Sequence, residues 1–292
     1  CAMPGAAWAL ATQIDNLDAH DGLNATKGHI GCALVPALFA FAETRPDLTG
    51  RQALTALAMG YEVAARAAVA LHATVSDYHT SGAWNALGVA ALGAHLRGDG
   101  AEVLRQALGI AEYHGPRSQM MREIASPTML HDGSGMGAFV GISSLLLAER
   151  GFTGAPAITV EGTEVAQVWA DLGHDWTVMR NYIKPYPICR WAHGALECLR
   201  VLVEEQGFSP EDIEALENLN SIYGFYLAHN QWDSLAGIFT EDGIIEIAMR
   251  GQYVGRDAVR RNLDLYGEQG GEQHGLLHNH MQFQPVITLA PD

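Results

Sequence analysis

The sequence predicts a mainly α-helical protein in two parts, an all-helical domain over residues 1–208 and a partial α+β cone over residues 209–292. Two observations predict this class. Up to about Gly207 the chain consists of runs rich in alanine, leucine and glycine, which are typical of packed helices. After "GFSPED" the pattern changes to shorter helices and to alternating apolar and polar residues, which are typical of strands.

The helices of the first part are predicted by composition. "RQALTALAMGYEVAARAAVAL" (51–71) has no proline and consists of strong helix formers, and "GAWNALGVAALGAHL" and "GSGMGAFVGISSLLLAER" are similar. Gly133, Gly137 and Gly141 recur at every fourth position, which places them on one helical stripe where a neighbouring helix can approach closely. The alternative is that "HDGSG" is a loop and only the later part is helical.

The second part begins with a clear helix start. Ser209 is a good N-cap, Pro210 fits the first helical position, and Asp212 follows the serine by three residues, so a helix is expected to about His229. A short helix "WDSLAGIF" follows, then two short strands in "GIIEIAMRGQYVG" and an amphipathic helix "GRDAVRRNLDLYG". "HNHMQFQPVITLAPD" predicts a final strand.

Composition limits the function. Charged residues make up 17% and apolar residues 48% of 292 residues, an ordinary globular profile. The formal net charge of −16 argues against binding to nucleic acid or to an anionic membrane, although a local basic pocket could still bind an anionic substrate. The four cysteines have neither metal-ligand spacing nor disulfide density, no signal peptide is visible and no apolar run reaches transmembrane length, so a cytoplasmic protein is expected.

Five polar clusters lie at predicted helix boundaries, where a helical scaffold exposes side chains and free N–H groups to a ligand. In chain order they contain Asp18, Asp21, Lys27 and His29; Tyr78 and His79; His114 and Arg117; His131 and Asp132; and Lys184, Tyr186, Cys189, Arg190 and His193. No single cluster is diagnostic, but five in one domain favour a shared pocket.

The residue types favour acid–base chemistry. The sequence contains no G-x-S-x-G, H-E-x-x-H, P-loop or dinucleotide fingerprint, and the histidines are too scattered to indicate a metal site. Histidine removes or delivers protons near neutral pH, while lysine and arginine hold carboxylates and stabilise enolate-like charge. This combination suits loss of water, decarboxylation or epimerisation next to a carboxylate.

The first part resembles a known family. "LDAHDGLNATKGHIGCALVPALFAFAE", "YHTSGAWNALGVAALGAHL", "ALGIAEYHGPRS", "MLHDGSGMGAFVGISSLLLAERGFTG" and "KPYPICRWAH" together look like the MmgE/PrpD family over about residues 5–212. That family includes 2-methylcitrate dehydratase, cis-aconitate decarboxylase and iminodisuccinate epimerase. The resemblance implies an all-helical domain, a homodimer and cofactor-free chemistry on di- or tricarboxylates.

The resemblance also implies a set of site residues. The expected catalytic residues are His79, His29, Asp21 and Lys184, and the expected substrate-binding residues are Asp18, Lys27, His131, Arg190 and His193. His29, His79 and Lys184 are expected to share one pocket, with His79 the better candidate for the base and with no metal. The alternative for His29 is a cap on the following helix. His131 stands where the family usually has a lysine, so a permanent charge becomes titratable.

The second part resembles a different superfamily. "LNSIYGFYLAHNQWDSLAGIFTEDGIIEIAMRGQYVGRDAVRRNL" and "HNHMQFQPVI" look like the SnoaL-like branch of the nuclear transport factor 2-like superfamily over about residues 213–292. The residues that match its usual polar positions are Tyr223, Tyr226, Asp233, Asp242 and His280, and the expected pocket contains Tyr223, Asp233 and His280. The alternative for the aromatic residues is a plain core. Because a complete cone has further strands, this one is expected to be truncated, with unpaired strand edges.

These observations lead to one expected function with alternatives. The chain is expected to be a cofactor-independent lyase, a dehydratase or decarboxylase, that acts on a small di- or tricarboxylate. Members of the family usually carry an α/β lid domain where the SnoaL-like stretch begins here. The alternatives are an isomerase or epimerase of the same family, or an inactive fusion or fragment that acts as a binding scaffold.

Overall fold

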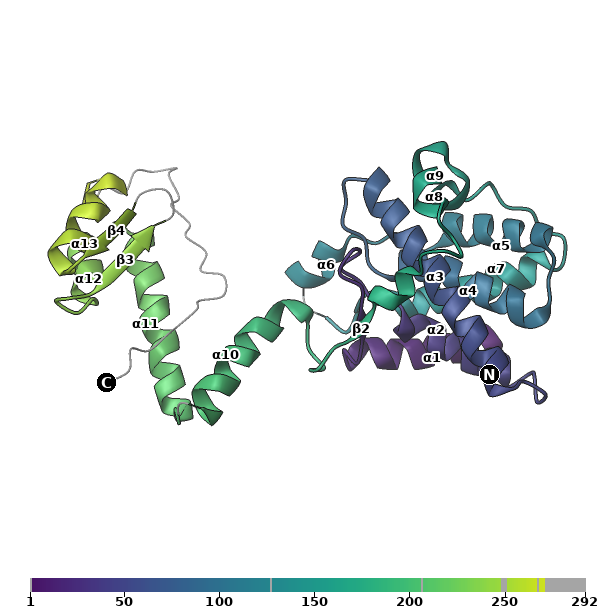
Figure 1. Ribbon diagram of the computed structural model, residues 1–292, viewed down its shortest axis with the longest axis horizontal. Helices are drawn as coiled ribbons and strands as arrows, with labels where there is room; N and C mark the ends of the chain where they lie inside the picture. The colour runs from purple at the N-terminus through teal and green to yellow at the C-terminus, as the bar shows by residue number, and fades with distance from the viewer. Residues whose placement is uncertain (1, 127, 206, 248–250, 267, 271–292) are drawn as a thin grey trace. The chain divides into compact units, whose positions relative to one another are not determined.

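The computed structural model describes residues 2–126, 128–205, 207–247, 251–266 and 268–270, and the chain forms two compact units, Cys1–Arg190 and Trp191–Asp292 (Figure 1). Helices dominate both units, and the described strands form one two-stranded sheet in each, which confirms the predicted fold class. The units divide before α10 (His193–Glu204), whereas the sequence analysis assigned that helix to the first part. Composition carries no signal for which unit an amphipathic helix contacts.

The first unit is a bundle of helices with short connecting turns (Figure 1). Its elements are α1 (Met3–Asn16), β1 (Asp21–Gly22), α2 (Gly31–Ala42), α3 (Gly50–Thr74), α4 (Gly82–Arg97), α5 (Ala101–His114), α6 (Met120–Ala125), α7 (Ser134–Ala148), α8 (Ile158–Glu161), α9 (Ala166–Trp169) and β2 (Tyr182–Ile183). Thr49 begins α3 with a capping box that includes Gln52.

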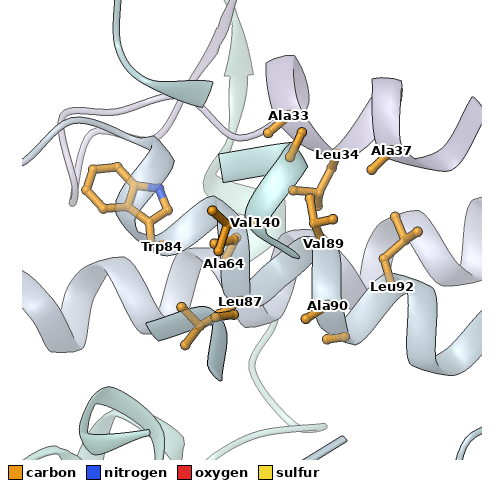
Figure 2. Packing of buried hydrophobic residues seen from close by; sticks show 14 of the residues in the cluster. Ala33, Leu34, Ala37, Ala64, Trp84, Leu87, Val89, Ala90, Leu92 and Val140 are labelled. Atoms are coloured by element: carbon orange, nitrogen blue, oxygen red, sulfur yellow. The ribbon is translucent and has the colours of Figure 1, made fainter. Parts of the chain in front are cut away.

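Helix α4 lies at the centre of the core, and every residue from Gly82 to Ala94 is buried. It packs along α3, α5 and α7 and against α2. Figure 2 shows Leu34 of α2 pointing toward Val89 of α4. The small residues predicted this close packing, because a Cβ atom at Gly88 would lie 2.7 Å from the carbonyl oxygen of Gly60 in α3.

The glycine stripe of α7 is confirmed in part. Cβ atoms at Gly137 and Gly141 would lie 2.8 and 2.6 Å from the carbonyl oxygens of Gly82 and Ala86, so α4 and α7 approach each other closely. Gly133 instead precedes the helix with a φ of +69°, a conformation that favours glycine. The first residues of "HDGSG" are therefore a loop.

Helix α3 is the one described helix that is long and apolar enough to cross a membrane by length and composition. No apolar run of this length was expected from the sequence. Of its apolar window, 56% is buried inside the structure, and the helix packs along α4.

The second unit has its own small core. Its elements are α10, α11 (Pro210–Ala228), α12 (Trp232–Gly237), β3 (Ile244–Ile247), β4 (Gly251–Val254) and α13 (Arg256–Leu263), with β3 and β4 antiparallel. The predicted capping box of Ser209 and Asp212, the short helix, the strand pair and the amphipathic helix are all confirmed. Trp232 and Leu235 are fully buried in the core. The predicted strand at 278–292 lies outside the described residues.

Candidate active site

A short antiparallel pairing brings Lys184 to the loop after α1. Asp21 of β1 pairs with Ile183 of β2, and the backbone N–H of Lys184 donates to the carbonyl oxygen of His20 at 3.2 Å. Two segments more than 160 residues apart in the sequence therefore lie side by side. The predicted proximity of the opening loop and the "KPYP" segment is what this pairing produces.

Asp21 is used to begin helix α2. Its Oδ1 accepts from the backbone N–H groups of Ile30 and Gly31 at 3.0 and 3.2 Å, and its Oδ2 accepts from Asn181 at 2.7 Å. A carboxylate at a helix N-terminus is stabilised by the unpaired N–H groups and the helix dipole. Asp21 thus orients the loop, and the catalytic role expected from the sequence stays a prediction.

His29 has one free ring nitrogen. Its Nδ1 lies 2.6 Å from the carbonyl oxygen of Asp21, and because a carbonyl only accepts, Nδ1 carries the hydrogen and Nε2 is left as an acceptor. Its backbone N–H donates to the Ser81 hydroxyl at 2.9 Å. Burial lowers the pKa of His29, and the positive charges of His20 and Lys184 lower it further against the opposing charge of Asp132. His29 is therefore a neutral base near pH 7.

Lys184 is buried and paired with Asp18. Its ammonium donates to Asp18 Oδ1 and, at 2.7 Å, to the carbonyl oxygen of Ile188. An ammonium has three hydrogens, so one is left for a ligand. Burial opposes ionisation of Asp18, but hydrogen bonds and charges from His20 and Lys184 outweigh it and lower the pKa of Asp18 to about 2. Asp18 therefore holds Lys184 and cannot bind an anionic carboxylate directly.

His20 and Asp15 join Asp18, His29 and Lys184 in one cluster of charged and titratable side chains. Neither His20 nor Asp15 was a predicted site residue. His20 Nε2 lies 3.1 Å from Asp15 Oδ1, and Nδ1 lies 2.7 Å from Asp18 Oδ1. Burial opposes its protonation, but the hydrogen bonds to Asp15 and Asp18 and the charge of Asp132 raise the pKa of His20 to about 9. The sequence signal was present as two aspartates five and two residues before a histidine, at the end of a helix.

His131, Asp132 and Glu123 form the other side of the cluster. The His131 ring contacts the His20 ring edge-on with centroids 5.7 Å apart, and its Nδ1 lies 3.9 Å from Glu123 Oε1. Asp132 is 1% exposed, and its Oδ1 accepts from the backbone N–H of Ser81. Burial, together with the charge of Asp132, raises the pKa of Glu123 to about 7. The sequence indicated His131 but not Glu123, whose role depends on burial.

His79 and Lys27 lie beside this cluster. His79 is buried, its Nδ1 donates to the carbonyl oxygen of Asp77 at 2.9 Å, and its backbone pairs with Gln119. Among the described contacts, none joins its ring to His29 or Lys184, so the shared pocket stays a prediction for this residue. Lys27 is exposed, with Nζ 5.8 Å from the centroid of the Tyr78 ring.

The remaining predicted residues belong to the end of the first unit and to the second unit. Arg190 is exposed, with its guanidinium carbon 5.8 Å from the centroid of the Tyr182 ring, and His193 begins α10 in the second unit. In the second unit Tyr223 packs against the small core. Asp233 is 69% exposed and pairs with Arg260, which differs from the expected pocket position because a carboxylate in the first turn of α12 points to solvent. His280 lies outside the described residues.

Two cavities border the cluster. A cavity of about 740 Å³ is lined by Asp15, Glu123 and His131 together with apolar residues such as Trp8 and Met136. A second cavity of about 470 Å³ is lined by residues that include Asp18, His20, Asp21 and Lys184. His29 lines neither of these two, but its side chain is only partly buried. Small carboxylates fit within cavities of this size.

In the part of the chain that the structure describes, two groups of side chains have metal-ligand character, and both share His20. They are Asp15, His20 and Cys32, and Asp18, His20 and His29. A metal requires neutral imidazole, whereas His20 is held protonated by a carboxylate at each nitrogen. Burial also raises the pKa of the Cys32 thiol, which disfavours the thiolate that a metal prefers. The charge arrangement thus favours ion pairing over metal binding.

Comparison with family models agrees with this architecture. The MmgE/PrpD N-terminal domain matches residues 1–176, and a SnoaL-like domain matches residues 209–292, which confirms the predicted combination of the two families. No curated protein matches the chain. The first match includes His29, His79 and His131 and ends before Lys184. The pairing of β1 with β2 brings Lys184 to the site. By the match over more than half of its length, the chain belongs to the MmgE/PrpD family, a family that includes dehydratases and related enzymes.

Proposed function

We propose that the first unit is a lyase that removes water or carbon dioxide from a small di- or tricarboxylate by acid–base chemistry of its side chains, with dehydration as the preferred reaction. One observation carries the proposal. The His29 ring has a fixed Nδ1–H, a free Nε2 and a lowered pKa, and it lies within the electrostatic reach of the Lys184 ammonium. A neutral base beside a buried cation suits proton removal next to a carboxylate.

The reaction divides between these two residues. His29 Nε2 takes the proton from the carbon next to the carboxylate, and the remaining Lys184 hydrogen binds the carboxylate and stabilises the negative charge that develops on it. Burial of the ammonium strengthens this interaction, since charges interact more strongly away from water.

Glu123 is our candidate for the acid that the leaving hydroxyl needs. It lines the larger cavity, and its pKa of about 7 keeps a large share protonated at neutral pH. The electron pair of the broken C–H bond forms the double bond, the C–O bond breaks, and the hydroxyl takes the Glu123 proton and leaves as water. A base with a lowered pKa and an acid with a raised pKa form the pairing that dehydration requires.

A screen of citrate-like and malate-like acids for loss of water or carbon dioxide tests the proposal on the full chain. We expect turnover of at least one acid, reduced about 10²–10⁴-fold in kcat by His29→Gln because general base catalysis contributes that factor. His95→Gln is the matched control, since His95 is exposed in the last turn of α4. If the folded chain turns over none of the acids, the proposal fails and the binding-scaffold alternative takes its place.

We also propose that the chain acts as a homodimer. Trp8 of α1 and Phe139 of α7 are 48% and 37% exposed and contact each other edge-on, so they form an apolar patch. Patches of this kind are typical of interfaces. Light scattering at micromolar concentration is expected to give twice the chain mass, and a monomer would contradict this proposal.

A further inference from the structure

His20 is held at both ring nitrogens by carboxylates. Its Nε2 lies 3.1 Å from Asp15 Oδ1 and its Nδ1 lies 2.7 Å from Asp18 Oδ1, and no part of its side chain is exposed. The Nε2 contact is a hydrogen bond and the Nδ1 contact is an ion pair. A carboxylate oxygen beside each nitrogen favours a hydrogen on both, and the ring is then an imidazolium. Asp15 is 2% exposed, so this charge pair is closed off from solvent.

Each carboxylate connects His20 to another part of the site. Asp15 Oδ2 accepts from the backbone N–H of Ser134, the first residue of α7, at 2.9 Å. Asp18 Oδ1 accepts from the Lys184 ammonium. The ring therefore lies where α1, α7 and the Lys184 segment meet, and it compensates two carboxylates that would otherwise be buried with a single cation.

The flat face of the His20 ring lies against the ring of His29, the proposed base. The His20 and His29 rings are stacked, with centroids 4.1 Å apart and planes inclined by 22°. A second positive ring against the first is unfavourable, so the imidazolium of His20 disfavours protonation of His29. The other charged or titratable groups around the pair are Asp21 and Cys32 beside α2, Glu123 of α6, His131 and Asp132 before α7, and Lys184.

We propose that His20 is a positioning residue of this site, an imidazolium clamped between Asp15 and Asp18 that fixes the plane of the His29 ring and keeps His29 Nε2 unprotonated. The raised pKa of His20 and the lowered pKa of His29 agree with this geometry. The part of the proposal that concerns catalysis rests on the proposed function, in which His29 is the base. The part that concerns protonation does not.

Nitrogen-15 NMR titration of the histidine side chains in the full chain tests the protonation directly, with signals assigned from His20→Gln and His29→Gln. We expect His20 to show two protonated nitrogens at pH 7 and His29 to show a protonated Nδ1 and a free Nε2. In His20→Gln the titration midpoint of His29 is expected to rise by at least about 0.7 pH unit, the effect of one unit charge about 4 Å away even in water. His95→Gln should leave it unchanged.

A neutral His20 ring at pH 7 in the unmodified chain would overturn the proposal. The variants are needed here only to assign the signals, because the measurement itself is made on the unmodified chain. An unchanged His29 midpoint in folded His20→Gln would overturn it as well. If turnover is found, the acid limb of the pH profile of kcat/KM should move to higher pH in His20→Gln by the same amount, which a merely structural role would not produce. Absence of turnover would count against the lyase and leave the titration result standing.

Discussion

The two sides of the cluster differ in how their charges are held. On one side Lys184, Asp18 and His20 form buried ion pairs, with a pKa of about 2 for Asp18 and about 9 for His20, so their charges stay fixed over the physiological range. On the other side Glu123 and His131 lie 3.9 Å apart, and Glu123 titrates at about 7. The difference is that the charges of Asp18 and His20 are fixed by buried ion pairs, whereas the carboxyl group of Glu123 changes its charge near neutral pH.

The largest effect is expected from Lys184→Met, which breaks the ion pair between Lys184 and Asp18. Loss of the ammonium removes the carboxylate anchor and leaves Asp18 without its cation, so we expect kcat to fall about 10²–10³-fold and stability to fall by about 3 kcal/mol. Steady-state kinetics and urea unfolding measure the two. Lys184→Arg keeps the charge and should retain most of the stability. Equal stability of the methionine and arginine variants would contradict the ion-pair role of Lys184.

The next largest effect is a pH dependence of stability that comes from His20. Because the pKa of His20 in the folded chain, about 9, lies above the ordinary value of 6.5, its contribution to stability is fully present below pH 6.5 and is lost as the pH rises through about 9. The shift corresponds to about 3 kcal/mol. Urea unfolding between pH 6 and 10 should show this decline, and His20→Gln should flatten it. A decline of equal size in His20→Gln would assign it to other groups.

Glu123→Gln is expected to raise the free energy of unfolding, whereas Lys184→Met is expected to lower it. The pKa of Glu123 in the folded chain, about 7, lies above the ordinary value of 4.5, so ionisation of Glu123 lowers stability as the pH rises from 4.5 to 7. We expect the glutamine variant to be more stable than the parent by about 1–2 kcal/mol above pH 7. Turnover should fall at the same time because the acid is lost. A variant of lower stability at pH 8 would contradict the assigned cost.

The smallest effect is expected at His131. Lysine at this position carries its charge at every pH near neutrality, whereas histidine carries it only when protonated. His131→Lys should therefore weaken the pH dependence of carboxylate affinity, by a few-fold in Kd, as isothermal titration between pH 6 and 8 would show. If His131→Ala leaves both affinity and turnover unchanged, this residue does not belong to the site.

The sequence predicted the helices of both units and most of the cluster, because these depend on local signals. These signals can be recognised directly in the sequence: runs of small residues, the capping box at Ser209 and polar residues at helix boundaries. His29, Asp18, Lys184 and His131 were all identified in this way. The position of Lys184 beside Asp18 depends on the two-residue β1–β2 pairing, which no local pattern could predict.

The roles within the cluster were less predictable. Asp15, His20 and Glu123 were missed because their importance comes from burial and from partners distant in the sequence, such as Ser134. Asp21 was expected to be catalytic from the family resemblance, and the sequence did not show that its carboxylate also accepts hydrogen bonds from the start of α2. The burial of a side chain and its partners determine its role in the cluster, and both are known only from how the helices pack.

Deuterium exchange tests the central claim, that His29 is the base of an acid–base site, most directly. Candidate di- and tricarboxylates are incubated with the chain in heavy water, and the carbon next to the carboxylate is followed by NMR. Epimerisation exchanges the proton at that carbon with the solvent, dehydration removes it and returns a solvent proton when it runs in reverse, and decarboxylation replaces carbon dioxide by a solvent proton. All three therefore leave deuterium on the carbon. The account predicts incorporation with the parent chain and with His95→Gln, and little or none with His29→Gln. Equal incorporation with His29→Gln, or none with the folded parent over the whole panel, would contradict it.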